Sequence, residues 1–176
     1  MGINADHRLG LRTVLGDHIE TWTIRTGPDR TRDVRSAALW YFLTPSVLAA
    51  PFIFVHFSVN GVGQILSGVA LFTGLLFALL VLMFNTGITL RKDGESLANA
   101  HDLRRVIADI RANVTYAAVT AMILASLLVV AAAVTPMNKS PYWAWTPVFL
   151  WLAVHLGLTL LTILRRLRTA FNYITR

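Results

Sequence analysis

The sequence predicts an all-α, polytopic membrane protein with four transmembrane helices and amphipathic cytoplasmic helices. Hydrophobic residues make up 55% of the 176 residues and charged residues only 14%, against roughly 25% charged in an ordinary soluble domain. The charges are also unevenly spread, because the 55 residues from Ser36 to Leu90 contain no Asp, Glu, Lys or Arg. A soluble core of this size cannot bury such a run, whereas a bilayer can.

Four segments are long and apolar enough to cross the hydrocarbon core, which needs about 20 helical residues. The charge-free run contains two of them, because the polar, glycine-containing stretch at 58–64 is typical of a turn. Strands of a membrane barrel would alternate polar and apolar residues, and these runs do not. The expected organisation is a cytoplasmic arm at 1–36, a transmembrane domain at 37–164 with spans at about 37–58, 65–90, 115–134 and 143–164, a cytoplasmic helical loop at 91–114, and a basic cytoplasmic tail at 165–176.

The distribution of lysine and arginine predicts the orientation of the spans. The arm, the helical loop and the tail contain 15 of the 16 basic residues, and the two short loops contain only Lys139. Basic residues concentrate on the cytoplasmic side of membrane proteins. We therefore expect both termini in the cytoplasm of a cell whose inner membrane contains the protein. The net charge of +7 is then mainly an orientation signal, and no binding of duplex DNA is expected.

Helical spacing of apolar residues continues outside the spans. In the arm, apolar residues recur from Leu11 to Trp22 with Arg and Asp opposite, which predicts an amphipathic helix lying on the membrane or on a neighbouring subunit. No helix breaker separates the loop from the third span, so one helix of about 39 residues is expected there, about 58 Å long. In the tail, one helical face carries Leu164, Leu167, Phe171 and Ile174.

The sequence lacks the motifs of common catalytic and cofactor sites. It contains no cysteine, which excludes disulfides and thiolate metal sites. It shows no paired-carboxylate motif, nucleophile elbow or zinc-binding helix motif. A haem bound between His56 and His155 is not expected, because their depths in the bilayer differ by on the order of 15 Å. We therefore expect a protein that is not an enzyme and that uses no cofactor and no metal.

Polar side chains of the fourth span form one stripe, with His155 near the middle of the membrane. The stripe consists of Trp151, His155, Thr159, Thr162 and Arg166. Such a stripe can line a water-filled path with His155 as a pH-sensitive gate. The alternative is a neutral histidine bonded to a neighbouring helix, with threonines bonded to their own backbone. Asn85 of the second span is a further pore candidate, because a buried amide needs a partner.

Other residues predict packing, kinks and surface binding. Small residues let membrane helices approach closely. The expected packing residues are Gly63, Ser67, Gly74 and Ala78 on the second span and Ala117, Ala121 and Ala125 on the third. Pro45 and Pro51 each remove a backbone N–H, free the carbonyls of Tyr41 and Val47, and are expected to kink the first span. The tail residues expected to bind anionic lipid or an acidic partner are Arg165, Arg166 and Arg168.

Four helices alone pack without an aqueous lumen, so a conducting protein of this kind would be a homo-oligomer with one stripe per subunit facing a central axis. The leading hypothesis is a small homo-oligomeric inner-membrane channel or pore-forming effector gated from the cytoplasm. The alternative is a non-conducting membrane scaffold that recruits a cytoplasmic partner. A small transporter is disfavoured, because no Asp, Glu, Lys or Arg lies inside an expected span.

The architecture resembles that of small bacterial membrane effectors of anti-phage, abortive-infection systems, such as the membrane components of the Kiwa and Hailong type. The shared features are four spans with the N-terminus inside, an amphipathic arm at 11–22 and a charged helix between the second and third spans. The resemblance covers the whole chain, rests on no sequence motif and assigns no residue roles. It implies an oligomer that depolarises the inner membrane when a cytoplasmic protein, nucleotide or oligonucleotide regulator releases it.

Overall fold

The computed structural model describes residues 11–21, 34–93, 100–136 and 139–174, and the regular structure in these ranges is entirely helical. In chain order the helices are α1 (Leu11–Glu20), α2 (Val34–Val55), α3 (Val62–Asp93), α4 (Ala100–Val134) and α5 (Trp145–Ile174). Helices α2 to α5 are each long and apolar enough to cross a membrane. The predicted all-α, multi-pass architecture is therefore confirmed.

The long helices extend beyond the expected spans. α4 is one helix of 35 residues that includes most of the expected helical loop as well as the third span. α5 continues through most of the expected tail and reaches Ile174. Both extensions follow from the absence of glycine and proline between the apolar segments and their charged continuations, because nothing in those stretches interrupts the backbone ladder.

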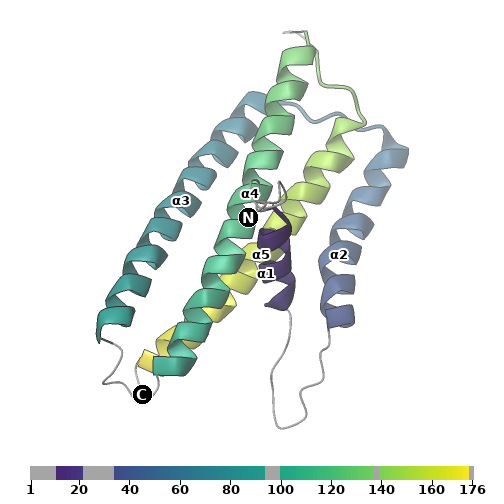
Figure 1. Cartoon of the computed structure of the whole chain (residues 1–176). Coiled ribbons are helices and arrows are strands. Elements are labelled where there is room, and N and C mark those ends of the chain that lie inside the picture. Colours follow the sequence, from purple (N-terminus) through teal and green to yellow (C-terminus); the bar gives the residue numbers. More distant parts are fainter. Residues whose placement is uncertain (1–10, 22–33, 94–99, 137–138, 175–176) are drawn as a thin grey trace, which may run out of the picture.

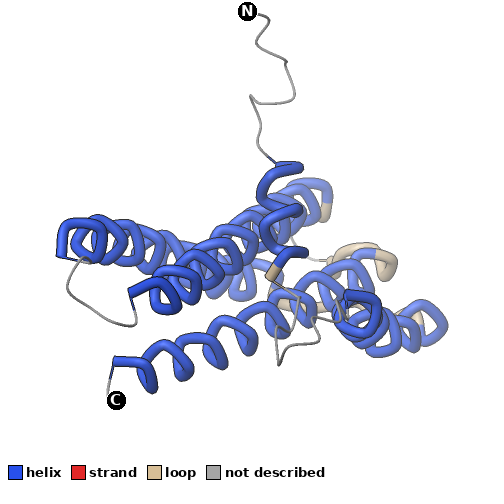
Figure 2. Tube along the Cα trace, turned by 60° about the horizontal axis from the view of Figure 1, so that its bottom comes forward, coloured by secondary structure: helices blue, strands red, loops and turns tan. Residues whose placement is uncertain are grey.

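The four long helices lie in a row (Figure 1). α3 packs against α4, α4 against α5, and α5 against α2, so that α2 and α3 form the two ends of the row. In the candidate spans, 39% of α4 and 28% of α5 are buried, against 11% of α2 and 6% of α3. α4 and α5 therefore form the centre of the molecule, and α1 lies against one side of the row (Figure 2).

Along the helix axes, the molecule has two ends that differ in charge. At one of them α2 and α4 begin and α3 and α5 finish, and we call it the basic end because it carries Arg111, Arg165, Arg166 and Arg168. The opposite end is called the far end. Two apolar clusters form the core. The cluster nearer the basic end joins α3, α4 and α5 and contains Leu76, Ile110, Val114, Ala117, Ala118, Ala121, Leu156 and Ile163. The cluster nearer the far end contains Val62, Leu124, Leu128, Ala131 and Phe149.

The small residues predicted to pack behave differently on α3 and α4, the second and third spans. Ala117 and Ala121 of α4 are fully buried in the basic-end cluster, and Ala125 is half-buried. By contrast, the predicted packing residues of α3 are exposed. A methyl group added to Gly63 or Gly74 meets no atom within 4 Å. Close packing through this second set does not occur within one chain, because α3 turns a different face, which includes Leu76, toward α4. The exposed set is Gly63, Ser67, Gly74 and Ala78.

α2 is one helix that includes both Pro45 and Pro51. It finishes at Val55, and the next residue, His56, has a positive φ of 52°, as is common after the last turn of a helix. Gly61 has a φ of 75° just before α3 begins, a backbone conformation that glycine adopts without strain. The link between them contacts α5, where the Val59 N–H donates to Thr146 Oγ1 at 3.2 Å.

Candidate functional site

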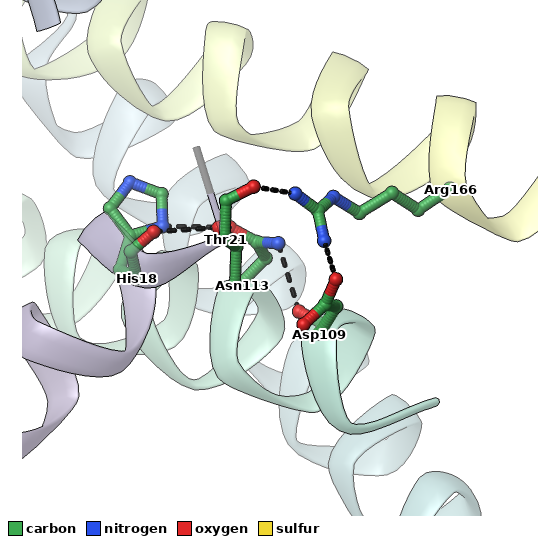
Figure 3. A network of polar contacts seen from close by, with 5 residues as sticks. All are labelled: His18, Thr21, Asp109, Asn113 and Arg166. Carbon is green, nitrogen blue, oxygen red and sulfur yellow. Dashed lines mark hydrogen bonds and ion pairs between the residues drawn. The ribbon is translucent and has the colours of Figure 1, made fainter. Parts of the chain in front are cut away.

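α1 packs against α4, and His18 is at the centre of that contact. The His18 side chain is fully buried. Its Nδ1 lies 2.7 Å from the Asn113 amide oxygen (Figure 3), and because that oxygen only accepts, Nδ1 is the protonated nitrogen. The His18 ring also stacks on the ring of Tyr116, with centroids 3.9 Å apart and planes 6° apart. A polar residue therefore anchors the arm.

Asn113 organises the other polar groups of this contact. The Thr21 hydroxyl lies 3.1 Å from the same Asn113 oxygen and 2.6 Å from the His18 carbonyl. The Asn113 Nδ2 group donates to the backbone carbonyl of Asp109 at 2.9 Å. Since Asn113 is fully buried, these bonds supply the partners that a desolvated amide requires.

Arg166 joins α5 to both α4 and the arm. One guanidinium nitrogen lies 2.5 Å from the Asp109 carboxylate, and the other donates to the backbone carbonyl of Thr21, at the end of α1 (Figure 3). A cation at this position also complements the negative end of the α1 helix dipole. We call the surface formed by Asp109, Asn113 and Tyr116 of α4 with Arg166 of α5 the seat of α1.

His155 links α5 to two further helices inside the row. It is 1% exposed. Its Nδ1 donates to the Tyr41 carbonyl at 3.1 Å, and its Nε2 lies 2.7 Å from the Tyr116 hydroxyl. The Tyr41 carbonyl is the acceptor that Pro45 leaves without an N–H in α2. The histidine thus completes the backbone hydrogen bonding of a proline-containing helix.

Tyr116 lies between the two buried histidines. Its ring face contacts His18 of the arm, and its hydroxyl contacts His155 of α5. Trp151 covers the other side of His155, with ring centroids 5.1 Å apart and planes 7° apart. A continuous set of ring and hydrogen-bond contacts therefore connects α1, α4 and α5, and it reaches α2 through the Tyr41 carbonyl.

The polar stripe of α5 points toward α2 and α4 inside the chain. Thr159 is fully buried and bonds the His155 carbonyl at 3.0 Å. Thr162 bonds the Leu158 carbonyl at 3.1 Å and contacts the Tyr41 hydroxyl. This geometry matches the alternative in which the histidine bonds a neighbouring helix and the threonines bond their own backbone. A pore-lining role in an assembly stays a prediction.

The other predicted pore and surface-binding residues are exposed. Asn85 is exposed on α3, which does not bring it to the α5 stripe. Arg165 and Arg168 are exposed at the basic end. Arg166, which was expected to bind lipid or a partner with them, pairs instead within the chain, because α4 presents Asp109 opposite it.

Burial controls the protonation of His18. Desolvation lowers its pKa from 6.5 to about 4, since the imidazolium form would lose its hydration. The hydrogen bond to Asn113 opposes this shift, whereas His155 and Arg166 lower the pKa further by repelling a second positive charge. His18 is therefore neutral near pH 7 in the docked arm.

Several features of this site correct the expectations from sequence. The arm lies on α4 of its own chain, whereas the expected location was the membrane or a neighbouring subunit. The candidate span of α4 begins at Ile107 and that of α5 extends to Arg168, so Asp109 and Arg166, which were expected in the cytoplasmic helical loop and the tail, lie within the candidate spans. The signal that could have found the site is a polar residue on an otherwise apolar helical face, as at His18 and Asn113.

In the described ranges, no group of three or more His, Asp or Glu residues is arranged to bind a metal ion. Comparison with known protein families, with curated proteins and with solved structures finds no match to this chain. The fold and the site define a multi-pass membrane protein with an N-terminal arm docked on its two central helices.

Proposed function

We propose that this chain is a subunit of a small homo-oligomeric channel or pore-forming effector of the bacterial inner membrane, gated from the cytoplasm by α1. The observation that supports this proposal is the docking of α1 at the basic end of the polar α5 stripe. Arg166 belongs to that stripe and also bonds the last turn of the arm. A movement of α1 would therefore directly change the surroundings of the stripe.

α1 has the properties of a releasable element. It is a helix of 10 residues, and isolated helices shorter than about 12 residues are marginally stable in water. Its apolar face is only partly covered, since Leu15 is 45% exposed. A few polar contacts to the seat therefore supply much of its docking free energy, and a regulator with modest affinity for the released arm can shift the equilibrium.

The row of helices supports an oligomer. A row encloses no lumen by itself, so conduction requires several chains around an axis. α2 and α3, at the two ends of the row, are largely unburied in the single chain, which leaves both available for contact with lipid or with further copies. In the docked state His155 is sealed between helices; release of α1 would uncover Tyr116, which contacts it.

The architectural resemblance to anti-phage effectors supplies a biological setting for this proposal. In that setting the regulator is a cytoplasmic protein, a nucleotide or an oligonucleotide, and release of the arm depolarises the inner membrane. The protein performs no catalysis. Arg165 and Arg168, both exposed at the basic end, are the residues that would contact anionic lipid or an acidic regulator.

The test compares two arginines near the basic end in proteoliposomes that contain the full chain. Arg166→Gln removes both the Asp109 pair and the Thr21 bond, whereas Arg111→Gln, at an exposed position of α4, is the matched control. We expect ion flux through the Arg166→Gln protein to exceed that of the unmodified protein several-fold, with the control unchanged. Absence of flux in all three proteins, while Arg166→Gln measurably frees the arm, would show that the chain does not conduct.

One observation favours the alternative function, a non-conducting scaffold. His155 and Thr159 are at most 1% exposed, and both are hydrogen-bonded within the chain, as expected for a structural element. In this function, release of α1 exposes a surface that recruits a cytoplasmic protein to the membrane. A stoichiometric soluble partner captured by the Arg166→Gln protein, together with a monomeric membrane part and no flux, would support it.

A further inference from the structure

The seat of α1 brings an ionisable side chain of the arm against groups from three other helices. The rings of Tyr116 on α4 and Tyr41 on α2 face His18, with centroids 3.9 and 5.8 Å away. From α5, His155 and Arg166 act on it electrostatically. The carboxylate of Asp109 in this network pairs with Arg166, and Asp17 on α1 itself is exposed.

We propose that the contact between α1 and its seat is a proton-binding site: uptake of a hydrogen ion by His18 drives α1 off α4 and α5. This inference rests on the proposed function only in naming the signal for release. The docking equilibrium itself is a property of one chain, and it can be measured without any flux.

The geometry explains why a protonated His18 and a docked arm oppose each other. The imidazole is fully buried, so a charge formed there would lose its hydration. The guanidinium of Arg166, which bonds the same arm at Thr21, would repel it. The face of Tyr116 would attract a cation, and the Asn113 bond also favours the charged ring, but these two effects are smaller than the desolvation. Leaving the seat returns the ring to water.

The direction and size of the effect follow from linkage. Docking lowers the pKa of His18 from 6.5 to about 4, so the docked chain binds fewer protons than the undocked chain. The stabilisation of docking is complete above pH 6.5 and is lost as the pH falls from 6.5 toward 4. Relative to pH 7.5, the docking equilibrium constant should decrease about 10-fold at pH 5.5 and about 70-fold at pH 4.5.

Hydrogen exchange of the α1 amides measures this equilibrium even when the undocked population is small. The protection factor, which is corrected for the intrinsic exchange rate at each pH, reports the fraction of time that the helix is open. The experiment uses the full chain in lipid nanodiscs at the three pH values, with mass-spectrometric readout of peptides that cover residues 11–21. We expect protection to fall by the two factors given above, while α4 protection near Leu128 stays constant.

Three variants identify the group that takes up the proton. His18→Phe keeps a ring against Tyr116 without an ionisable group, so α1 protection should no longer depend on pH. His56→Gln alters an exposed histidine at the far end and should leave the pH response unchanged. His155→Gln should also keep most of it; if the response disappears in this variant, His155 is the titrating group and the proposal is wrong.

A direct titration covers the case in which His18→Phe fails to dock. The histidine ring carbons of the unmodified protein are followed by NMR, and the His18 signal is assigned by its loss in His18→Gln. A pKa well below 6.5 in the docked protein, which returns toward 6.5 when Arg166→Gln weakens docking, supports the proposal. Constant α1 protection from pH 7.5 to 4.5, or an unshifted His18 pKa, overturns it.

The two proposals fail in different ways. If α1 protection falls with acid but no variant conducts ions, the proton site stands and the channel function does not. If the Arg166→Gln protein conducts ions while the hydrogen-exchange protection of α1 does not change with pH, α1 is a gate that a different signal releases.

Discussion

The half of the molecule near the far end and the half near the basic end bury different kinds of side chain. Near the far end, the interior is mainly apolar and contains Leu124, Leu128 and Phe149. Near the basic end, the buried set includes His18, Asn113, His155 and Thr159. Lipid tails solvate apolar side chains about as well as a protein interior does, so the far half depends on the fit of its surfaces. In the basic half, hydrogen-bond partners specify which helices meet, and it is there that we propose that α1 leaves its seat.

The largest expected effect is in the basic half. Asn113→Ala removes the acceptor of the buried His18 Nδ1–H, while the Thr21 hydroxyl keeps the His18 carbonyl at 2.6 Å; the loss should be about 3 kcal/mol, the upper end of the usual range, or more than a hundredfold in docking. Hydrogen exchange should show α1 unprotected while the core of α5 stays protected. Ser126→Ala, at an exposed position of the same helix, is the matched control and should change neither helix. Full α1 protection in Asn113→Ala would mean that the arm docks by apolar contact alone.

The far half should respond differently to truncation. Leu128 is fully buried, and Leu128→Ala should lower the free energy of unfolding by about 2 kcal/mol, the lower end of the usual range, because the cavity contribution remains while lipid reduces the transfer contribution. Unfolding in mixed detergent measures this loss. The docking of α1 relative to the folded row should not change. A selective loss of α1 protection would contradict the division into two halves.

A smaller effect on α1 docking is expected when either residue of the Asp109–Arg166 ion pair is substituted. Asp109 is 50% exposed at its side chain, and pairs of this kind contribute at most about 1 kcal/mol. Asp109→Asn keeps the Arg166 bond to Thr21, whereas Arg166→Gln loses both contacts. We expect α1 protection to decrease about 3-fold in the first variant and about 10-fold or more in the second. Equal decreases would show that the bond to Thr21 contributes nothing.

The smallest effect is expected for Tyr116→Phe. This change keeps the ring that stacks on His18 and removes only the hydroxyl that contacts His155. The free energy of unfolding should decrease by about 1 kcal/mol, with α1 docking nearly unaffected. Chemical unfolding and α1 protection are measured on the same sample. A large loss of protection would show that the two histidines are more tightly coupled than the ring contact indicates.

The transmembrane helices could be predicted from sequence because the bilayer imposes a strong requirement on them. A span needs about 20 apolar residues in a helix, and the four candidate spans each contain such a segment. The limits of the spans were less predictable. Asp109 and Asn113 were assigned to a cytoplasmic helical loop continuous with the third span, and α4 does continue through both as one helix, but its candidate span already begins at Ile107.

The candidate site was predictable only in separate parts. His155 stands out as an ionisable residue in an apolar segment, and Pro45 predicts a free carbonyl at Tyr41. Their meeting could not be derived, because the hydrogen bond joins positions 114 residues apart and depends on which helices are neighbours. The same holds for His18 and Asn113, which are 95 residues apart. Local periodicity indicates that a polar residue needs a partner, but not which residue supplies it.

The order of helices in the row constrains how the protein is made. α2 and α3 leave the ribosome before α4 and α5, yet they lie at opposite ends of the row, and α2 packs against α5 (Figure 1). Arg166, which bonds α1 at Thr21, follows Thr21 by 145 residues. During translation, therefore, α1 and α2 are synthesised before α4 and α5, the helices on which they pack. Every nascent chain consequently passes through a period in which α1 is not yet docked.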